Sequence, residues 1–196
     1  FYLLSEKKIY LIGSGGHAKV CLETILSTKK YKIIGFIDKK IKKKILDYKI
    51  IGNDKDLPGL RKNAKFACIG IGQIKNFLVR EKKFNQLKKL KFILPKIISS
   101  YAIVSKFSKI GEGTIVMHGA IIHPGAKIGK NCIINTNSII EHDVEVKDNC
   151  HISTKAIING NSTIEKNSFI GSGSVIVNNI SVKKNSFIKA GSIITN

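Results

Sequence analysis

A six-residue repeat runs without interruption from residue 98 to residue 194 and constrains the fold more than any other feature. Ile or Val stands at every sixth position, and small residues dominate the position four residues after each of them. Amphipathic helices have a period of 3.6 residues and ordinary strands alternate with a period of 2, so neither produces a strict period of six. A hexapeptide repeat does, with three hexads in each triangular coil. The repeat therefore predicts a left-handed parallel β-helix with the aliphatic residues inside.

The residue before each interior aliphatic should point outward, and these residues define three outer faces. The first face is apolar and consists of Ile103, Ile121, Ile139, Ile157, Val175 and Ile193. The second face is apolar apart from one histidine and consists of Ile115, Ile133, His151, Phe169 and Phe187. The third face is polar and consists of Lys109, Lys127, Glu145, Thr163 and Ser181. Because large exposed apolar patches usually mark interfaces, we expect a closed homotrimer packed through the edge between the two apolar faces.

The residues before the repeat alternate between strand and helix patterns. Strands are predicted at 8–12, 32–37, 66–71 and 92–94, and helices at 18–27 and through about residue 89. This order is typical of a small parallel sheet covered by helices. We therefore expect an α/β domain at 1–95 and the β-helix at 96–196. Cys132 and Cys150 are expected to be inward neighbours on adjacent coils.

A glycine-rich turn in the first domain has the spacing of a nucleotide-binding site. Gly13-x-Gly15-x-x-Ala18 follows the first strand and opens a helix, and Asp38 ends the second strand. This satisfies the relaxed dinucleotide fingerprint, in which the helix N-terminus binds phosphates. The domain offers about one of the two halves of an NAD site, so a single nucleotide diphosphate fits better. A structural turn that needs glycine for positive φ is the alternative.

The segment Ile140-Glu141-His142-Asp143 places an imidazole beside two carboxylates within one coil. Acyl transfer from a thioester needs a base, and histidine titrates in the range that suits this task. A neighbouring carboxylate can fix the tautomer and stabilise the imidazolium. A surface histidine in a polar corner is the alternative interpretation.

Three other histidines suggest an interface or a metal. His151 is the one polar residue of the second face, and we expect it to line a cleft between subunits. His118 and His123 raise the alternative of a metal-dependent hydratase, because carbonic anhydrases on this scaffold hold zinc with three histidines. A third ligand two coils from His118 would stand at position 154 or 82, which are Thr and Lys. We therefore expect no metal.

The formal charge of +21 comes almost entirely from lysine, since Arg61 and Arg80 are the only arginines. Lysine lacks the planar fork that reads bases, so we expect no nucleic-acid partner, although anionic small substrates would be attracted. No apolar run approaches the ~18 residues of a membrane span. The opening Phe1-Tyr2-Leu3-Leu4 is too short for a signal peptide, so a cytoplasmic location is expected.

Across nearly the whole chain these residues resemble the bacterial nucleotide-sugar acetyltransferases of the sialic acid O-acetyltransferase group. The similarity is to the UDP-4-amino-sugar N-acetyltransferases of the bacillosamine pathway in particular, within the hexapeptide-repeat superfamily. It rests on Ile12-Gly-Ser-Gly-Gly-His-Ala18, Phe36-Ile-Asp38, Ile69-Gly70, Asn135-Thr136, Ile140-Glu-His142 and Cys150-His151-Ile-Ser153. The resemblance implies a Rossmann-like N-terminal domain, a β-helix, and trimers with active sites between subunits.

The resemblance also implies roles for individual residues. His142 is the general base and Asp143 its acidic partner. The nucleotide-sugar site takes Gly15, Gly16, His17, Asp38, Lys39 and Gly70, with Asn135 near the acceptor. Acetyl-CoA contacts fall on His151, Gly160, Ser172 and Ala190, with the Gly160 N–H facing the thioester oxygen. Lys39 and Ala190 depart from the family pattern, which carries an acid and a glycine there, and the Gly-x-Pro-Ala tail is missing after Asn196.

We therefore expect an acetyl-CoA-dependent N-acetyltransferase acting on a nucleotide-linked amino sugar. O-acetylation of sialic acid or a related nonulosonic sugar is the nearest alternative. A metal-dependent hydratase and a non-catalytic nucleotide-sensing protein are the others.

Overall fold

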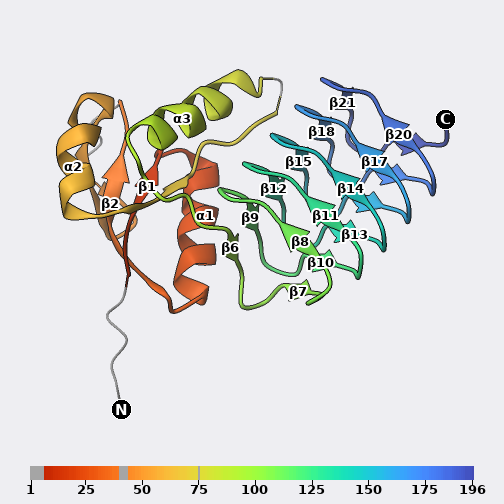
Figure 1. Ribbon diagram of the computed structural model, residues 1–196, viewed down its shortest axis with the longest axis horizontal. Coiled ribbons are helices and arrows are strands. Elements are labelled where there is room, and N and C mark those ends of the chain that lie inside the picture. The colour runs from red at the N-terminus through yellow and green to blue at the C-terminus, as the bar shows by residue number, and fades with distance from the viewer. Residues whose placement is uncertain (1–6, 40–43, 75) are drawn as a thin grey trace, which may run out of the picture.

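The computed structural model describes residues 7–39, 44–74 and 76–196, so the opening segment Phe1-Tyr2-Leu3-Leu4 lies outside the described residues. An α/β domain and a stack of coils stand side by side (Figure 1). The elements of the α/β domain are β1 (Lys7–Ile12), α1 (Gly16–Ser27), β2 (Tyr31–Ile37), β3 (Lys44–Ile45), β4 (Tyr48–Gly52), the 3-10 helix η1 (Asp54–Asp56), α2 (Leu57–Asn63), β5 (Phe66–Ile69) and α3 (Leu78–Lys89).

The sheet of this domain has the strand order β3-β4-β2-β1-β5. Strands β4, β2, β1 and β5 are parallel, and β3 pairs with β4 as an antiparallel edge. The predicted last strand at 92–94 is wrong: only Ile93 forms a bridge, to Phe66. Ile93 exchanges two backbone hydrogen bonds with Lys65 and Ala67, and Phe92 and Leu94 on either side of it are buried in the core, so the segment is held by one bridge and its side chains.

The second domain is the parallel β-helix that the repeat predicts. Its strands are β6 (Ile97–Ile98), β7 (Ile103–Val104), β8 (Lys109–Ile110), β9 (Ile115–Val116), β10 (Ile121–Ile122), β11 (Lys127–Ile128), β12 (Ile133–Ile134), β13 (Ile139–Ile140), β14 (Glu145–Val146), β15 (His151–Ile152), β16 (Ile157–Ile158), β17 (Thr163–Ile164), β18 (Phe169–Ile170), β19 (Val175–Ile176), β20 (Ser181–Val182), β21 (Phe187–Ile188) and β22 (Ile193–Ile194). They form three parallel sheets, and each sheet carries one of the three predicted outer faces.

The interior of the β-helix is filled as the repeat predicts. The interior aliphatic residues form one buried cluster, in which Cys132 and Cys150 are also fully buried. Adjacent coils pair in register at a spacing of eighteen residues, for example Ile133 with His151 and His151 with Phe169. The left-handed β-helix and the α/β domain are therefore confirmed.

A second period, in the backbone, forms the corners. From Gly113 to Gly191 every sixth residue has a φ near +60° to +80°. Glycine tolerates this left-handed conformation, and asparagine and aspartate adopt it more readily than other residues. Apart from Lys155, the residues at these positions are all Gly, Asn or Asp, and Asp143 is one of them, with a φ of 60°. The left-handed backbone at this corner therefore favours Gly, Asn or Asp at position 143, whether or not the residue takes part in catalysis.

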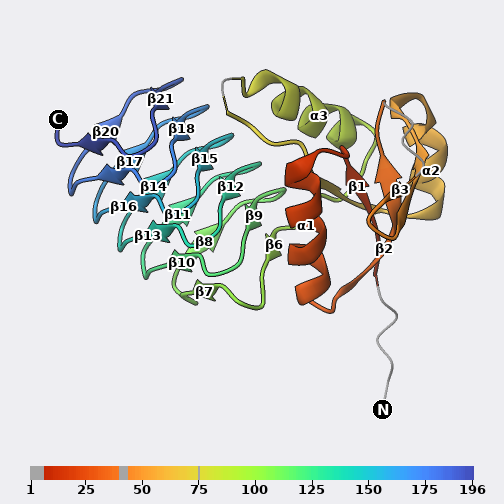
Figure 2. The same ribbon diagram turned by 180° about the vertical axis from the view of Figure 1, so that it is seen from behind.

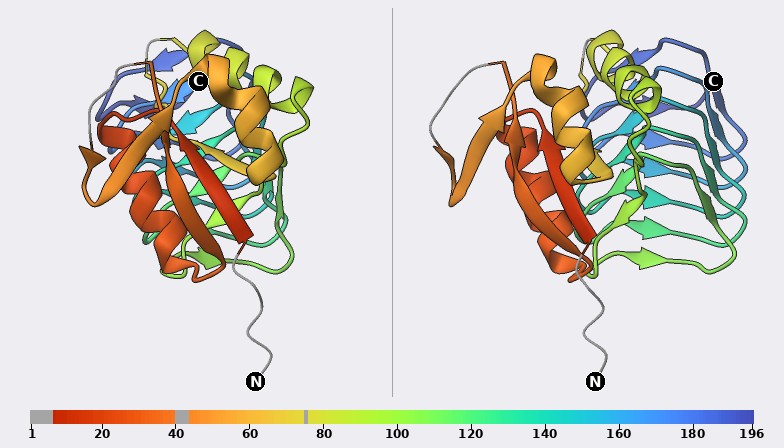
Figure 3. Two further views of the ribbon diagram at one scale, coloured as in Figure 1. Left: turned by 90° about the vertical axis from the view of Figure 1, so that its left-hand side faces the viewer. Right: turned by 60° about the vertical axis from the view of Figure 1, so that its left-hand side comes forward.

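Helix α1 joins the two domains by covering part of the second face. Side chains of β1 and α1, such as Leu11 and Leu22, share one buried cluster with Ile97, Ile115 and Ile133 of the β-helix. Figure 2 shows α1 standing between the sheet and the coils, and Figure 3 shows the α/β domain on one flank of the β-helix. The expectation that both apolar faces serve self-association is therefore corrected: the chain itself covers the lower part of the second face.

None of the helices within the described ranges is long and apolar enough to cross a bilayer.

Candidate active site

His142 lies at the corner where the first face meets the third, in the turn between β13 and β14. Its Nδ1 is 3.0 Å from Asp143 Oδ2, and the two side chains are 61% and 64% exposed. The contact between imidazole and carboxylate is therefore direct. Because a carboxylate can only accept, Nδ1–H donates to Asp143, and Nε2 carries the free lone pair. This arrangement can accept a proton at Nε2 while Asp143 stabilises the resulting charge.

Glycines leave the space that these two side chains occupy. A Cβ on Gly160, one coil above, would lie 2.6 Å from His142 Cε1 and 2.7 Å from its Nε2. A Cβ on Gly125, one coil below, would collide with the carboxylate of Asp143. The Gly160 N–H has no backbone acceptor within the described ranges, while its carbonyl accepts from Asn179. An N–H donor therefore lies beside the imidazole.

The histidines that raised the metal alternative lie at different corners. His123 Nε2 is 3.7 Å from Glu141 Oε1, in the coil below His142. His118 Nδ1 is 2.6 Å from Ser99 Oγ, and its ring packs edge-on against Tyr101. In the part of the chain that the structure describes, no three His, Cys, Asp or Glu side chains are grouped so that they could hold a metal ion.

A cavity of about 730 Å³ opens in the α/β domain at the carboxyl ends of β1 and β2. Of the predicted nucleotide residues, Gly15, Asp38 and Lys39 line it, together with Gly13 and Ser14 of the turn. Gly16, His17 and Gly70 do not line it. A Cβ on Gly70 would lie 2.9 Å from Ala18 Cβ, so this glycine serves the close packing of β5 against α1.

The opposite wall of this cavity comes from α3, which the sequence did not assign to the site. Val79, Lys82, Lys83 and Gln86 line it, together with Asp54. Lys83 Nζ pairs with Asp54 Oδ1 at 2.6 Å and donates to Gln86 Oε1 at 2.7 Å. Lys83 is thus neutralised by Asp54, whereas Lys39 and Lys82 add positive charge to the cavity beside the N-terminus of α1, which suits an anionic ligand.

His151 is buried between the two domains of its own chain and is 5% exposed. Its Nδ1–H donates to the backbone carbonyl of Gln73, and its Nε2 is 3.1 Å from Asn135 Nδ2. Its ring packs edge-on against Phe169. That it lines a cleft between subunits stays a prediction; within a single chain, the α/β domain covers the ring.

Burial keeps two histidines of this interface neutral. Desolvation lowers the pKa of His151 to about 4, although the Gln73 carbonyl opposes this shift. Desolvation, followed by the positive charges of Arg80 and His151, lowers the pKa of His17 to about 3. The charged form of a buried imidazole loses its hydration, which explains both directions.

Arg80 of α3 is fully buried and joins the domains through backbone carbonyls. Its guanidinium donates to Ile69 and Ile71 at 2.7 and 2.9 Å, and to Asn131 and Gly113 at 3.2 and 3.4 Å. A buried charge needs such partners, since it is costly to leave without them. Arg80 therefore fixes α3, and with it one wall of the cavity, on the β-helix.

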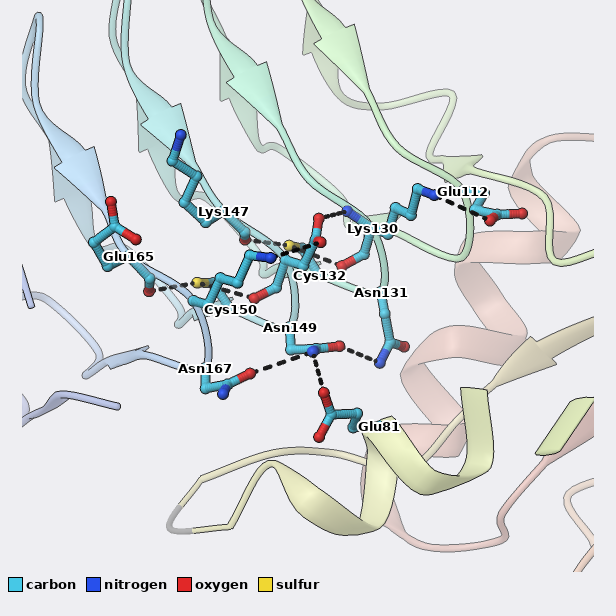
Figure 4. A network of polar contacts seen from close by, with 12 residues as sticks. Glu81, Glu112, Lys130, Asn131, Cys132, Lys147, Asn149, Cys150, Glu165 and Asn167 are labelled. Carbon is cyan, nitrogen blue, oxygen red and sulfur yellow. Dashed lines mark hydrogen bonds and ion pairs between the residues drawn. The ribbon is translucent and has the colours of Figure 1, made fainter. Parts of the chain in front are cut away.

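A ladder of asparagines continues this attachment along the corner between the third and second faces (Figure 4). Asn149 Nδ2 donates to Glu81 Oε1 at 3.0 Å and to Asn167 Oδ1 at 3.2 Å. Asn131 Nδ2 donates to Asn149 Oδ1 at 2.9 Å. The first turn of α3 is thus bound to a rigid edge of the β-helix.

The remaining predicted residues lie at the corner between the second and first faces. Asn135 is half-buried there, and Ser172 and Ala190 are exposed in higher coils. Ser172 Oγ is 2.9 Å from Ser153 Oγ. The first face separates this corner from the corner that carries His142, and the α/β domain covers the face opposite to His142. A single chain therefore does not bring His142 together with Asn135 or with the cavity.

Two family models match the chain, one in each domain. The model described as PglD N-terminal domain matches residues 8–87, and the model described as GMPPB C-terminal domain matches residues 116–196. Among curated proteins, none matches the sequence significantly.

Several solved structures are similar over almost the whole chain. The acetyltransferase domain of PglB from Neisseria gonorrhoeae is 28% identical, with a TM-score of 0.91 over 97% of this chain and 92% of that one. A second structure of that domain is in complex with acetyl coenzyme A. PerB from Caulobacter crescentus, in complex with CoA and GDP-perosamine, is 26% identical, with a TM-score of 0.91 over 96% of this chain and 89% of that one.

Proposed function

We propose that this chain, which belongs to the hexapeptide-repeat nucleotide-sugar acetyltransferases with a PglD-type N-terminal domain, transfers the acetyl group of acetyl-CoA to the amine of a nucleotide-linked amino sugar. The observation that carries this proposal is the His142–Asp143 pair, whose free Nε2 lies beside the backbone of Gly160. The similarity to proteins solved with acetyl coenzyme A, or with CoA and GDP-perosamine, supports both substrates.

The reaction follows from these positions. The sugar ammonium first loses a proton to solvent, and the neutral amine attacks the thioester carbonyl carbon. His142 Nε2 accepts one of the two protons on the attacking nitrogen as the tetrahedral intermediate forms, and the other stays on the product amide. The C–S bond then breaks, and the imidazolium returns the proton to the CoA thiolate. Asp143 stabilises the imidazolium, and the Gly160 N–H donates to the oxyanion, an effect often worth ~3 kcal/mol.

The nucleotide occupies the cavity of the α/β domain. The cavity volume of about 730 Å³ is within the ordinary range for ligand sites. The glycine-rich turn and the N-terminus of α1 bind the diphosphate, and Lys82 adds a positive charge to the opposite wall. Since nucleotide sugars and acetyl-CoA are cytosolic metabolites, the proposal includes a cytoplasmic location.

A homotrimer assembles the complete site from two copies. The first face remains open at both ends of the β-helix, where Ile103 is 68% and Ile193 is 69% exposed. Packing this face against another copy would bring the corner of His142 close to a neighbour's Asn135 corner. The wide separation of these corners within one chain is what supports active sites between subunits.

Replacement of His142 by Ala tests the role of the base. We expect turnover to fall by ~100-fold or more, while calorimetry shows that CoA binding is retained. His123→Ala, one coil below, is the matched control and should turn over close to the wild-type rate. Unchanged turnover in His142→Ala would remove this residue from the mechanism.

A further inference from the structure

Two polar side chains of the nucleotide cavity are joined through a single ammonium group. Lys83 Nζ lies 2.6 Å from Asp54 Oδ1 and donates to Gln86 Oε1 at 2.7 Å. The Lys83 side chain is only 11% exposed, so protein surrounds this contact. Asp54 and Gln86 both line the cavity, and the shared ammonium holds them next to each other.

The lysine determines what the other two side chains offer to a ligand. An ammonium can only donate, so it contacts the oxygen of the Gln86 amide, and the NH₂ group of that amide remains for a ligand. A carboxylate can only accept, so the second oxygen of Asp54 remains as an acceptor. The two side chains therefore present one acceptor and one donor side by side.

This pattern of hydrogen-bonding groups distinguishes the nucleotide bases. Uracil carries a ring N–H donor beside a carbonyl oxygen, and guanine carries the same pair of groups on its own edge. Cytosine and adenine carry the reverse, which is a ring nitrogen acceptor beside an amino group. Asp54 and Gln86 match the oxo bases uracil and guanine at both atoms. They mismatch cytosine and adenine at both, which leaves polar groups without partners and costs binding energy.

The position of Asp54 and Gln86 suits the base rather than the phosphates. The glycine-rich turn and the N-terminus of α1 form the part of the cavity that suits a diphosphate. Asp54 and Gln86 also line a neighbouring hollow of about 500 Å³, and no residue of that turn lines this hollow within the described ranges. They therefore lie on the side away from the turn. Apolar side chains of the cavity can pack against the faces of a base there, namely Ile37, Ile71 and Val79.

We propose that Asp54 and Gln86, oriented by Lys83, select a nucleotide with an oxo base, such as uracil or guanine, as the carrier of the amino sugar. The inference rests on the proposed function for the sugar, but the selection itself concerns only the nucleotide. Because cytosine mismatches both side chains, a CMP-linked sugar is a poor ligand for this cavity.

Two pairs of nucleoside diphosphates test the selection, since the members of each pair differ only in the base. We expect calorimetry to show that the wild type binds UDP roughly 10- to 100-fold more tightly than CDP, and GDP more tightly than ADP by a similar factor. Lys82→Ala, on the same cavity wall, is the control, because the loss of a positive charge should weaken all four nucleotides alike. Equal binding of UDP and CDP by the wild type would overturn the inference.

An exchange of the two side-chain groups should reverse the preference. In the double variant Asp54→Asn with Gln86→Glu, Lys83 can still contact one oxygen of each side chain, and the net charge is unchanged. Position 54 then offers an NH₂ donor and position 86 an acceptor, which is the pattern that cytosine and adenine require. We expect CDP to bind at least as tightly as UDP, with an unfolding midpoint close to wild type. An unchanged preference for UDP would overturn the inference.

Two single variants test the separate parts of this arrangement. Gln86→Glu alone mismatches one of the two groups, so the ratio of UDP to CDP affinity should fall close to one. Lys83→Met leaves the Gln86 amide free to turn, so the same ratio should shrink severalfold even where UDP still binds. Wild-type ratios in both variants would show that these side chains do not select the base.

These titrations need no acetyl-CoA, so they separate the base selection from the proposed function. A preference for UDP and GDP without acetylation of any nucleotide-linked amino sugar would contradict the proposed function and support the base selection. Acetylation of such a sugar with no preference among the four nucleotides would contradict the base selection alone. Failure of all four nucleotides to bind would contradict both.

Discussion

Gly160 lies directly against the imidazole of His142, and a Cβ at this position would stand 2.6 Å from Cε1. The absence of a side chain at Gly160 therefore leaves the space that the His142 ring occupies. Gly160 has no unusual φ that would itself exclude alanine, and the three atoms nearest to a built Cβ all belong to the His142 ring.

Gly160→Ala should consequently displace His142 without unfolding the protein. We expect kcat to fall by about tenfold to 100-fold, since a base that is moved by 1 Å no longer meets the amine correctly. Asn178→Ala, in the same column one coil higher, is the control and should keep both rate and stability. A fully active Gly160→Ala variant would show that the observed ring position is not the reactive one.

Asp143→Asn separates the charge of this residue from its role at the corner. Asparagine accepts the positive φ, so we expect the unfolding midpoint to stay within the error of the wild type. The rate should fall by roughly tenfold or more, because the imidazolium loses its carboxylate. Asp143→Gly should keep the fold and be equally slow. Equal rates for wild type and Asp143→Asn would show that Asp143 serves only the backbone conformation of the corner and not catalysis.

Arg80→Met should destabilise the protein by about 2–4 kcal/mol, since four backbone carbonyls lose their donor at the domain interface. The free energy of unfolding is measured by urea titration. The other arginine provides the comparison: Arg61 donates to the Lys91 carbonyl near the surface, and Arg61→Met should change stability by less than about 1 kcal/mol. Similar losses in both variants would mean that Arg80 does not join the domains.

The buried histidines predict that stability falls in acid. The folded-state pKa values of His17 and His151, about 3 and about 4, lie below the ordinary value of 6.5. The unfolded chain therefore binds more protons between these values, and stability is lost as the pH falls from about 6.5 toward 4. Urea midpoints measured across this range should decline less steeply in His151→Asn than in the wild type. Parallel declines would show that His151 does not contribute.

Trimer assembly is tested by a charge on the first face. Ile139→Lys should give monomers by light scattering and should also abolish acetyl transfer, because a monomer lacks half of the site. Thr163→Lys, on the polar third face, should remain trimeric and active. An active monomer would contradict the shared site.

The hexapeptide period predicted the interior of the β-helix completely, because an inward aliphatic residue every sixth position fits no other regular structure. It could not show what covers the second face. Apolar residues are expected at Ile115 and Ile133 whether α1 or another copy of the chain packs on them. The sequence therefore cannot distinguish these two interfaces. Gly, Asn or Asp recurs at every sixth position at the corners of the β-helix, and this period is also visible in the sequence. It would have predicted the positive φ of Asp143.

The wall of the nucleotide cavity was harder to foresee. Helix α3 is so rich in lysine that no apolar face indicates its orientation, so Lys82 and Gln86 could not be assigned to a ligand. Arg80 did carry a signal, because it is one of two arginines among many lysines. Its four carbonyl partners come from both domains, and only the folded chain brings them together.

Acetyl transfer itself is tested most directly with acetyl-CoA labelled in its acetyl group. The protein is incubated with UDP- and GDP-linked 4-amino sugars, with hydroxyl analogues of each, and with free and CMP-linked sialic acids. We predict labelled amide on at least one nucleotide-linked amino sugar, detected by mass spectrometry, together with release of free CoA. Label found only on a hydroxyl group, or no transfer to any of these acceptors, would contradict the assignment.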